Sequence, residues 1–246
     1  KINSIRQLQS VVDLGIIMTY AESSPNSNSV SVTPSLTQYI SAGLLSTDET
    51  INKAVTANNL NAINSAVNAL TAPQVNSVAN LQTVVDAYSK ILKQADGSKN
   101  LTLDASLVPT VADYKAIGVS LGKAETDVNS LTLLNEVIGG INTFAVDTIS
   151  EINAFTTTID KVANIVAATD AAQATLVGLA STDLLPLGIT GVTADNLAQV
   201  VNAIRLTSGV PTQKIQGLTS LQSVVDLGVI MNYAETANNS TAHIAP

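Results

Sequence analysis

The chain has 246 residues, of which 46% are hydrophobic and only 12% charged, with a formal net charge of −8 and no cysteine. This hydrophobic share excludes a chain that is disordered by composition. The sequence is acidic and lacks the clustered lysines and arginines that bind nucleic acid or anionic lipid. The missing cysteine excludes disulfides and thiolate chemistry, and no apolar run reaches the ~18 residues that a transmembrane helix needs.

The first predicted element is a helix that opens an internal repeat. Its apolar residues recur at steps of three and four, which places them on one helical face: Ile2, Ile5, Leu8 and Val12. Residues 8–22 match residues 221–235 at all but two positions. The last predicted helix is therefore a near copy of the first.

The same order of elements follows each long helix. A polar stretch such as residues 23–28 comes next, and then a short helix that ends at a glycine suited to a left-handed C-cap. These glycines are Gly43, Gly118 and Gly188. Pro186 predicts that the third short helix is shorter than the others. A third helix then begins at a capping residue, most clearly at Thr193.

One aspartate marks each copy of the long helix: Asp13, Asp86, Asp160 and Asp226. Their spacings of 73, 74 and 66 residues predict an all-α fold of tandem three-helix units of about 70 residues, stacked into an elongated array. The expected units are 1–73, 74–147 and 148–213, with a fourth unit beginning within 214–246. A β fold is disfavoured, because strands need an apolar spacing of two.

The recurring aspartates are also the first candidates for a functional site. Calcium needs six to eight oxygen ligands, and no second acidic residue recurs beside them. We therefore interpret them as structural anchors, bonded to a loop of the same or the next unit. His243, the only histidine, lies near the C-terminus and suggests no catalytic triad. We expect no catalytic residue, no cofactor and no enzymatic activity.

The loop 96–104 is a weak calcium candidate through Asp96 and Asp104. Its oxygens alternate as in the first part of a calcium loop, but Leu101 and Leu107 stand where such a loop has glycine and the closing glutamate. We favour a polar loop that holds no metal.

The matching end helices predict an assembly contact. Residues 1–22 are expected to pack where residues 214–235 would pack in the next register, so that chains associate head to tail. The expected partner is another copy of the chain or a neighbouring repeat. The predicted contact is the apolar face of the last helix, formed by Ile215, Leu218, Leu221, Val225 and Val229.

Three short motifs resemble the repeats of very large secreted bacterial surface proteins, of the giant adhesin and S-layer kind. They are Leu-Gln-Thr-Val-Val-Asp at 81–86, Asp-Tyr-Lys-Ala-Ile-Gly-Val at 113–119, and the segment 192–204, which begins Val-Thr-Ala-Asp-Asn-Leu. The resemblance implies a structural module at the cell surface, in an adhesin stalk, surface layer or filament, and it supplies no catalytic residues. The alternative is a ligand-binding module that recognises a glycan or host protein through grooves between helices.

Overall fold

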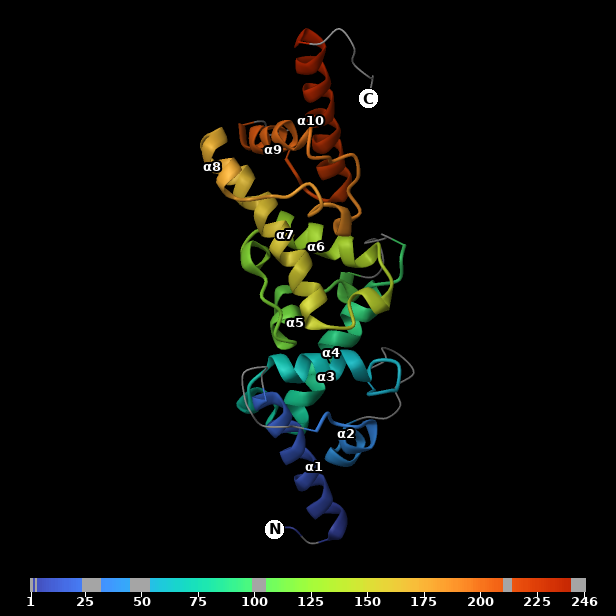
Figure 1. The fold of residues 1–246 in the computed structure, drawn as a ribbon. Coiled ribbons are helices and arrows are strands. Elements are labelled where there is room, and N and C mark those ends of the chain that lie inside the picture. Colours follow the sequence, from blue (N-terminus) through green and yellow to red (C-terminus); the bar gives the residue numbers. More distant parts are fainter. Residues whose placement is uncertain are drawn as a thin grey trace. The chain divides into compact units, whose positions relative to one another are not determined.

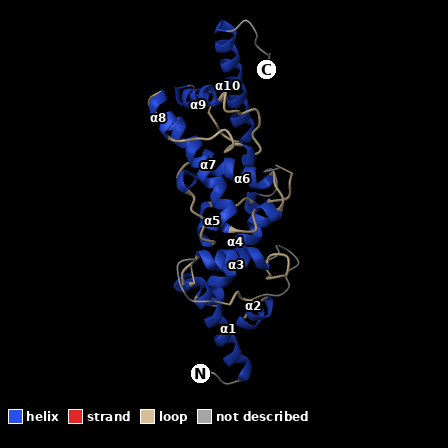
Figure 2. Cartoon of the chain, viewed as in Figure 1, coloured by secondary structure: helices blue, strands red, loops and turns tan. Residues whose placement is uncertain are grey.

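A computed structural model gives the fold of the chain (Figures 1 and 2). The residues that it describes are 2, 4–23, 32–44, 54–98, 105–209 and 214–239. This part of the chain is all-α and contains no β-strand, which confirms the all-α part of the predicted fold class. None of the described helices is long and apolar enough to cross a membrane.

The described α-helices vary in length from six to 22 residues. They are α1 (Ile5–Glu22), α2 (Leu36–Ala42), α3 (Leu60–Ala69), α4 (Val78–Gln94), α5 (Val111–Ala116), α6 (Val128–Gly139), α7 (Ile149–Ala167), α8 (Ala171–Leu176), α9 (Leu197–Leu206) and α10 (Leu218–Asn239). The short 3-10 helices are η1 (Ala72–Val75), η2 (Ala105–Leu107), η3 (Gly122–Glu125), η4 (Thr143–Ala145), η5 (Leu185–Leu187) and η6 (Thr207–Gly209).

The helices form two compact units. Unit 1 comprises Lys1–Leu121 and Ile141–Asn153, and unit 2 comprises Gly122–Gly140 and Ala154–Pro246. Helix α7 begins in unit 1 and continues into unit 2. The compact units are thus not consecutive stretches of sequence, because packing groups residues that meet in space, whereas a repeat records similarity along the chain.

Two of the long helices begin at capping side chains. Ser4 precedes α1 and accepts a hydrogen bond from the amide of Gln7 at 3.2 Å. Before α7, Thr148 and Glu151 form a reciprocal capping box, in which each side chain accepts from the other residue's amide. Such caps satisfy amides that have no partner inside the helix and set where each helix starts.

The short helices end as predicted. Gly43, Gly118 and Gly188 adopt φ values of 115°, 84° and 83°, which residues that carry a Cβ rarely adopt. The third short element, η5, is only three residues long and contains Pro186. The predicted shortening is confirmed, because proline has no amide to continue a helical hydrogen-bond series.

The third helix starts later than the sequence pattern suggests. We expected it to begin at Thr193, but α9 begins at Leu197. The side chain of Asn196 accepts the Thr193 amide at 2.8 Å and donates to the Gly191 carbonyl at 2.8 Å, which holds the intervening residues in a turn. A local side-chain bond to the backbone therefore wins over helix extension here.

Each unit has its own hydrophobic core. In unit 1, Tyr39, Tyr88 and Tyr114 are fully buried, and burial raises the pKa of each phenol well above its usual value. The hydroxyl of Tyr39 donates to Asn64 at 2.8 Å. In unit 2, α10 packs against α9 and α6, and α8 also contacts α9. The largest buried contributions from these unit 2 helices are aliphatic: Leu133, Leu134, Ile138, Val200, Ile204 and Leu221.

Candidate functional site

Three of the four recurring aspartates accept a hydrogen bond from a glutamine of their own helix. The side-chain amides of Gln9, Gln82 and Gln222 donate to Asp13, Asp86 and Asp226, four residues further on, at 3.1, 2.8 and 2.8 Å. Asp160 differs, because it accepts the backbone amide of Lys123 at 2.6 Å. Within the described residues, no group of three or more acidic or histidine side chains is placed to hold a metal ion.

Helix α10 shows what such a glutamine does. The Oε1 of Gln222 accepts the Thr190 amide at 2.9 Å, and its Nε2 donates to the Thr190 carbonyl at 3.1 Å. The same Nε2 donates to Asp226, which fixes the orientation of the side-chain amide. Asp226 therefore acts as a positioning residue for a contact between α10 and the loop that follows η5.

The calcium candidates are only partly described. Asp96 is exposed and accepts the Ser98 amide at 2.8 Å. The hydrogen bonds from the Ser98 side chain and backbone hold the pKa of Asp96 below its usual value. Asp104 and His243 lie outside the described residues. The described part of this loop is a turn in which Asp96 holds Ser98, and the Gly97 amide donates to the Ile141 carbonyl at 3.1 Å.

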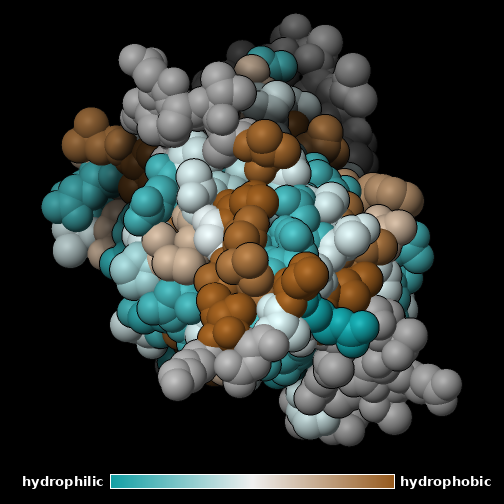
Figure 3. Space-filling model, turned by 90° about the horizontal axis from the view of Figure 1, so that it is seen from below, coloured by the Kyte–Doolittle hydropathy of each residue, from teal (hydrophilic) through white to brown (hydrophobic). Residues whose placement is uncertain are grey.

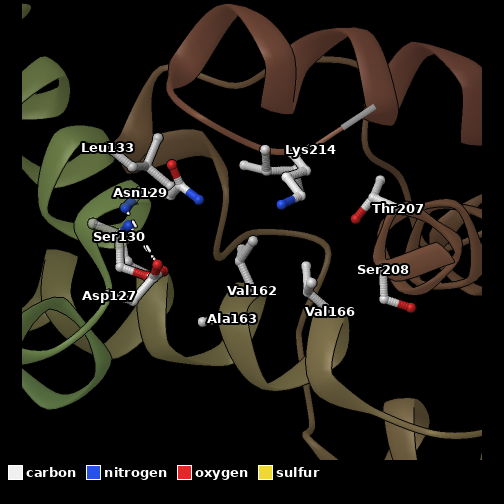
Figure 4. Close-up of a pocket in the computed structure, with 12 residues that line it drawn as sticks. Asp127, Asn129, Ser130, Leu133, Val162, Ala163, Val166, Thr207, Ser208 and Lys214 are labelled. Carbon is white, nitrogen blue, oxygen red and sulfur yellow. Dashed lines mark hydrogen bonds between the residues drawn. The ribbon is translucent and has the colours of Figure 1, made fainter. Parts of the chain in front are cut away.

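A cavity of about 340 Å³ lies in unit 2, between α6, α7 and the segment before α10. Val162 and Val166 project into it from α7, and Lys214 points into it from the opposite side (Figure 4). Asp127 is engaged as the N-cap of α6, where it accepts the Ser130 amide at 3.0 Å. The described lining residues include no aromatic ring on which a sugar could stack, and no histidine. The Ser130 hydroxyl donates to Asp127 at 2.6 Å, but that carboxylate also accepts the Ser130 amide as part of the N-cap of α6.

The residues predicted as an assembly contact lie mostly inside unit 2. Leu218, Leu221 and Val225 are buried against the rest of that unit, whereas Ile215 and Val229 are half-buried. Helix α10 thus already fills the surface that its apolar face was expected to seek on a neighbour. A contact between chains through these side chains requires that α10 leave unit 2.

The matching face of α1 is uncovered. Leu8 and Val12 correspond to Leu221 and Val225 in the repeat, yet they are 50% and 47% exposed, whereas their counterparts are fully buried. Figure 3, viewed from the side where the N-terminal end of α1 lies in Figure 1, shows hydrophobic side chains gathered in a band. The exposed apolar side chains of this part of the chain, which we call the α1 face, are Ile2, Ile5, Leu8, Val11 and Val12.

The second halves of the two helices show the reverse burial. Ile17 of α1 is fully buried in unit 1, where α1 packs on α2 and α3. Its counterpart Ile230 on α10 is 54% exposed. The same sequence is therefore covered along its first half in α10 and along its second half in α1. Sequence reasoning missed this division, although the duplicated helix was its visible signal.

Comparisons with known proteins add no identity to this geometry. A scan against protein-family models, a search of curated proteins and a search of solved structures each find no match to this chain. The features of the chain that bear on its function are the α1 face and the repeat.

Proposed function

We propose that this chain is a non-enzymatic structural module that associates head to tail through the α1 face. One observation carries the proposal: a nearly identical helix buries the corresponding side chains in α10 and exposes them in α1. A contiguous apolar stripe on a helix usually lies against a partner. Because α10 buries this stripe, the nearly identical sequence of α1 is also suited to a buried position.

The size of the α1 face sets the strength of the contact. Its five exposed aliphatic side chains offer on the order of 300 Å², which at about 25 cal/mol per Å² corresponds to several kcal/mol. Association itself costs about 4–15 kcal/mol in lost translational and rotational freedom. The stripe alone therefore supports only a weak, concentration-dependent contact, and a stable junction needs polar contacts or a linked chain in addition.

The proposed array is one of tandem three-helix units. A recurring ion pair supports it: Lys90 on α4 contacts Asp113 of α5 at 2.8 Å, and Lys161 on α7 contacts Asp183, just before η5, at 2.7 Å. Each pair joins a long helix to the short element that follows it. Both pairs lie within a single predicted unit, 74–147 or 148–213, so the same internal contact recurs in two units, as expected for repeated units.

We further propose an extracellular setting, in an adhesin stalk, surface layer or filament of a bacterial cell. The support is the resemblance of residues 81–86, 113–119 and 192–204 to repeats of giant surface proteins, together with the low share of charged residues, 12%. A surface that is poor in charge suits a chain whose units are covered by neighbours.

Sedimentation velocity tests the structural role. The full chain should show a weight-average mass that rises with concentration, and Leu8→Asp should abolish the rise because it places a charge within the α1 face. The control is Leu185→Asp, at an exposed apolar position of unit 2 that is far along the sequence from α1. Self-association that is equal in all three proteins would remove the proposal.

A further inference from the structure

Two glycines at matching positions behave differently in the two end helices. A Cβ placed on Gly228 of α10 would lie 2.6 Å from the Cα of Val200 on α9, so the close approach of these helices requires glycine. Gly15, its counterpart on α1, has no such neighbour within 4 Å of the same point. Glycine inside a helix costs stability relative to alanine. Gly15 therefore has a cost in α1 that the approach of another backbone, as in α10, would offset.

A polar side chain of α1 repeats this pattern. Gln222 of α10 holds both backbone groups of Thr190. Gln9, its counterpart, is exposed, and its amide bonds in the described structure go to the two carboxylate oxygens of Asp13, both at 3.1 Å. The Gln9–Asp13 pair thus has the form that binds a loop backbone in unit 2, but among the described residues no loop backbone bonds to Gln9.

We propose that the α1 face binds, on a second copy of this chain, the surface of unit 2 on which that copy's own α10 lies. This inference rests on the proposed head-to-tail association and names its partner surface. We call that surface the α10 seat and define it by Glu136, Thr190, Gly191, Gln199 and Val200. Helices α1 and α10 then compete for one seat, and α10 caps it within its own chain.

The residues of α1 fit the α10 seat. Gly15 matches Gly228 at the contact with Val200, and Gln9 matches Gln222 at the Thr190 loop. The buried side of α1, around Ile17, corresponds to the exposed side of α10, around Ile230. A seated α1 could therefore keep its packing on α2 and α3.

The two helices differ at the position that lies against Glu136 in the α10 seat. The Glu136 side chain accepts the Leu218 amide, and a Cβ on Gly217 would lie 2.5 Å from its carboxylate oxygens. The matching residue of α1 is Ser4, which caps its own helix by accepting the Gln7 amide. Helix α1 does not need the carboxylate of Glu136 as a cap, and this flexible side chain can turn aside.

Competition within the chain sets how the assembly responds. Because α10 is tethered beside its seat, its effective concentration is on the order of millimolar, so it outcompetes the α1 of a free second copy in dilute solution. Weakening α10 should therefore increase association between chains. Most interface substitutions in a protein have the opposite effect, which makes this result diagnostic.

The test weakens α10 in the full chain with Gly228→Val. The added side chain meets the Val200 backbone, so we expect α10 to leave the seat and the dissociation constant for self-association to fall by at least about tenfold, measured by sedimentation velocity. Gly15→Val in the same chain should reverse the gain, because the incoming α1 then carries the same clash. If Gly228→Val leaves association unchanged or weakens it, the inference is wrong.

Crosslinking gives a second readout that identifies the contact. The chain has no native cysteine, so introduced thiols are unambiguous. Gln199 donates to Glu235 in the α10 seat, and Glu22 is the α1 counterpart of Glu235. We therefore mix a chain carrying Gln199→Cys and Gly228→Val with a chain carrying Glu22→Cys, and add a bismaleimide. A covalent heterodimer is expected, and Gly15→Val in the second chain should remove it.

The controls separate this inference from the proposed function. Gln199→Cys with Glu235→Cys in one chain with native Gly228 should crosslink within the chain and verify the reach of the reagent. If Leu8→Asp abolishes association but Gly15→Val does not, the α1 face binds another surface, and only the seat is wrong. If neither change affects association, the structural role itself fails.

Discussion

Matched glycines give the sharpest prediction at the scale of single residues. Gly15→Ala should raise the free energy of unfolding by about 0.5–1 kcal/mol, because alanine favours the helix and its Cβ meets nothing in this chain. Gly228→Ala should lower it, because the same Cβ lies 2.6 Å from a backbone atom of α9. Urea unfolding of dilute protein measures both. Equal effects of the two substitutions would show that α10 does not approach α9 this closely.

The ion pair between Lys90 and Asp113 gives a prediction that depends on pH. Partial burial raises the pKa of Asp113, but hydrogen bonds from Lys90 and Thr110 outweigh it and leave that pKa below its usual value. A lowered folded-state pKa stabilises the fold above the unfolded value of about 3.9, and this contribution is lost as pH falls through the folded-state value.

Lys90→Met should therefore lower the free energy of unfolding at pH 7, by up to about 1 kcal/mol for a pair that is partly accessible to water. The difference from the unchanged chain should disappear in acid, once Asp113 is protonated in both proteins. Urea unfolding at pH 7 and pH 2.5 checks this. Lys93→Met, at an exposed position on the same helix, is the control and should leave the pH dependence unchanged.

At the scale of elements, the duplicated helix allows one substitution to be made in two environments. Val225→Asp in α10 should cost about 3 kcal/mol or more, because it buries an unpaired charge in the core of unit 2. Val12→Asp in α1 should cost well under 1 kcal/mol, because that position is 47% exposed. The sequence around both valines is identical from residue 8 to 15 and from 221 to 228, so helix propensity cannot account for a difference. Thermal and urea unfolding measure both variants. An equal loss of stability in the two variants would contradict the exposure of the α1 face.

At the scale of the whole molecule, the prediction concerns metal. No described group of side chains is placed to hold an ion, and the Asp96 carboxylate bonds to Ser98. Because a ligand stabilises a fold in proportion to the logarithm of its concentration over its dissociation constant, millimolar calcium would raise Tm if a site existed. We expect calcium or a chelator to change Tm by less than about 1 °C. A shift of several degrees would indicate a calcium site, for which Asp96 and Asp104 are the first residues to substitute.

The sequence by itself determined the local structure. Apolar steps of three and four gave the long helices, and Gly43, Gly118 and Gly188 gave the ends of the short elements. Pro186 correctly indicated the shortest of these. Such features depend on bonds and torsions within a few residues, which a sequence displays directly. The late start of α9 was missed because the Asn196 side chain competes with helix extension.

Only the tertiary structure decided which face of each end helix is covered. Residues 8–15 and 221–228 are identical, so no property of those residues could distinguish exposed Leu8 from buried Leu221. Burial depends on what else packs there: α10 packs against α9 and α6, whereas α1 packs against α2 and α3. The sequence predicted the assembly contact on the last helix. In the structure the exposed copy of that apolar face lies on the first helix instead. The reason is that burial depends on which neighbours the fold brings against each helix.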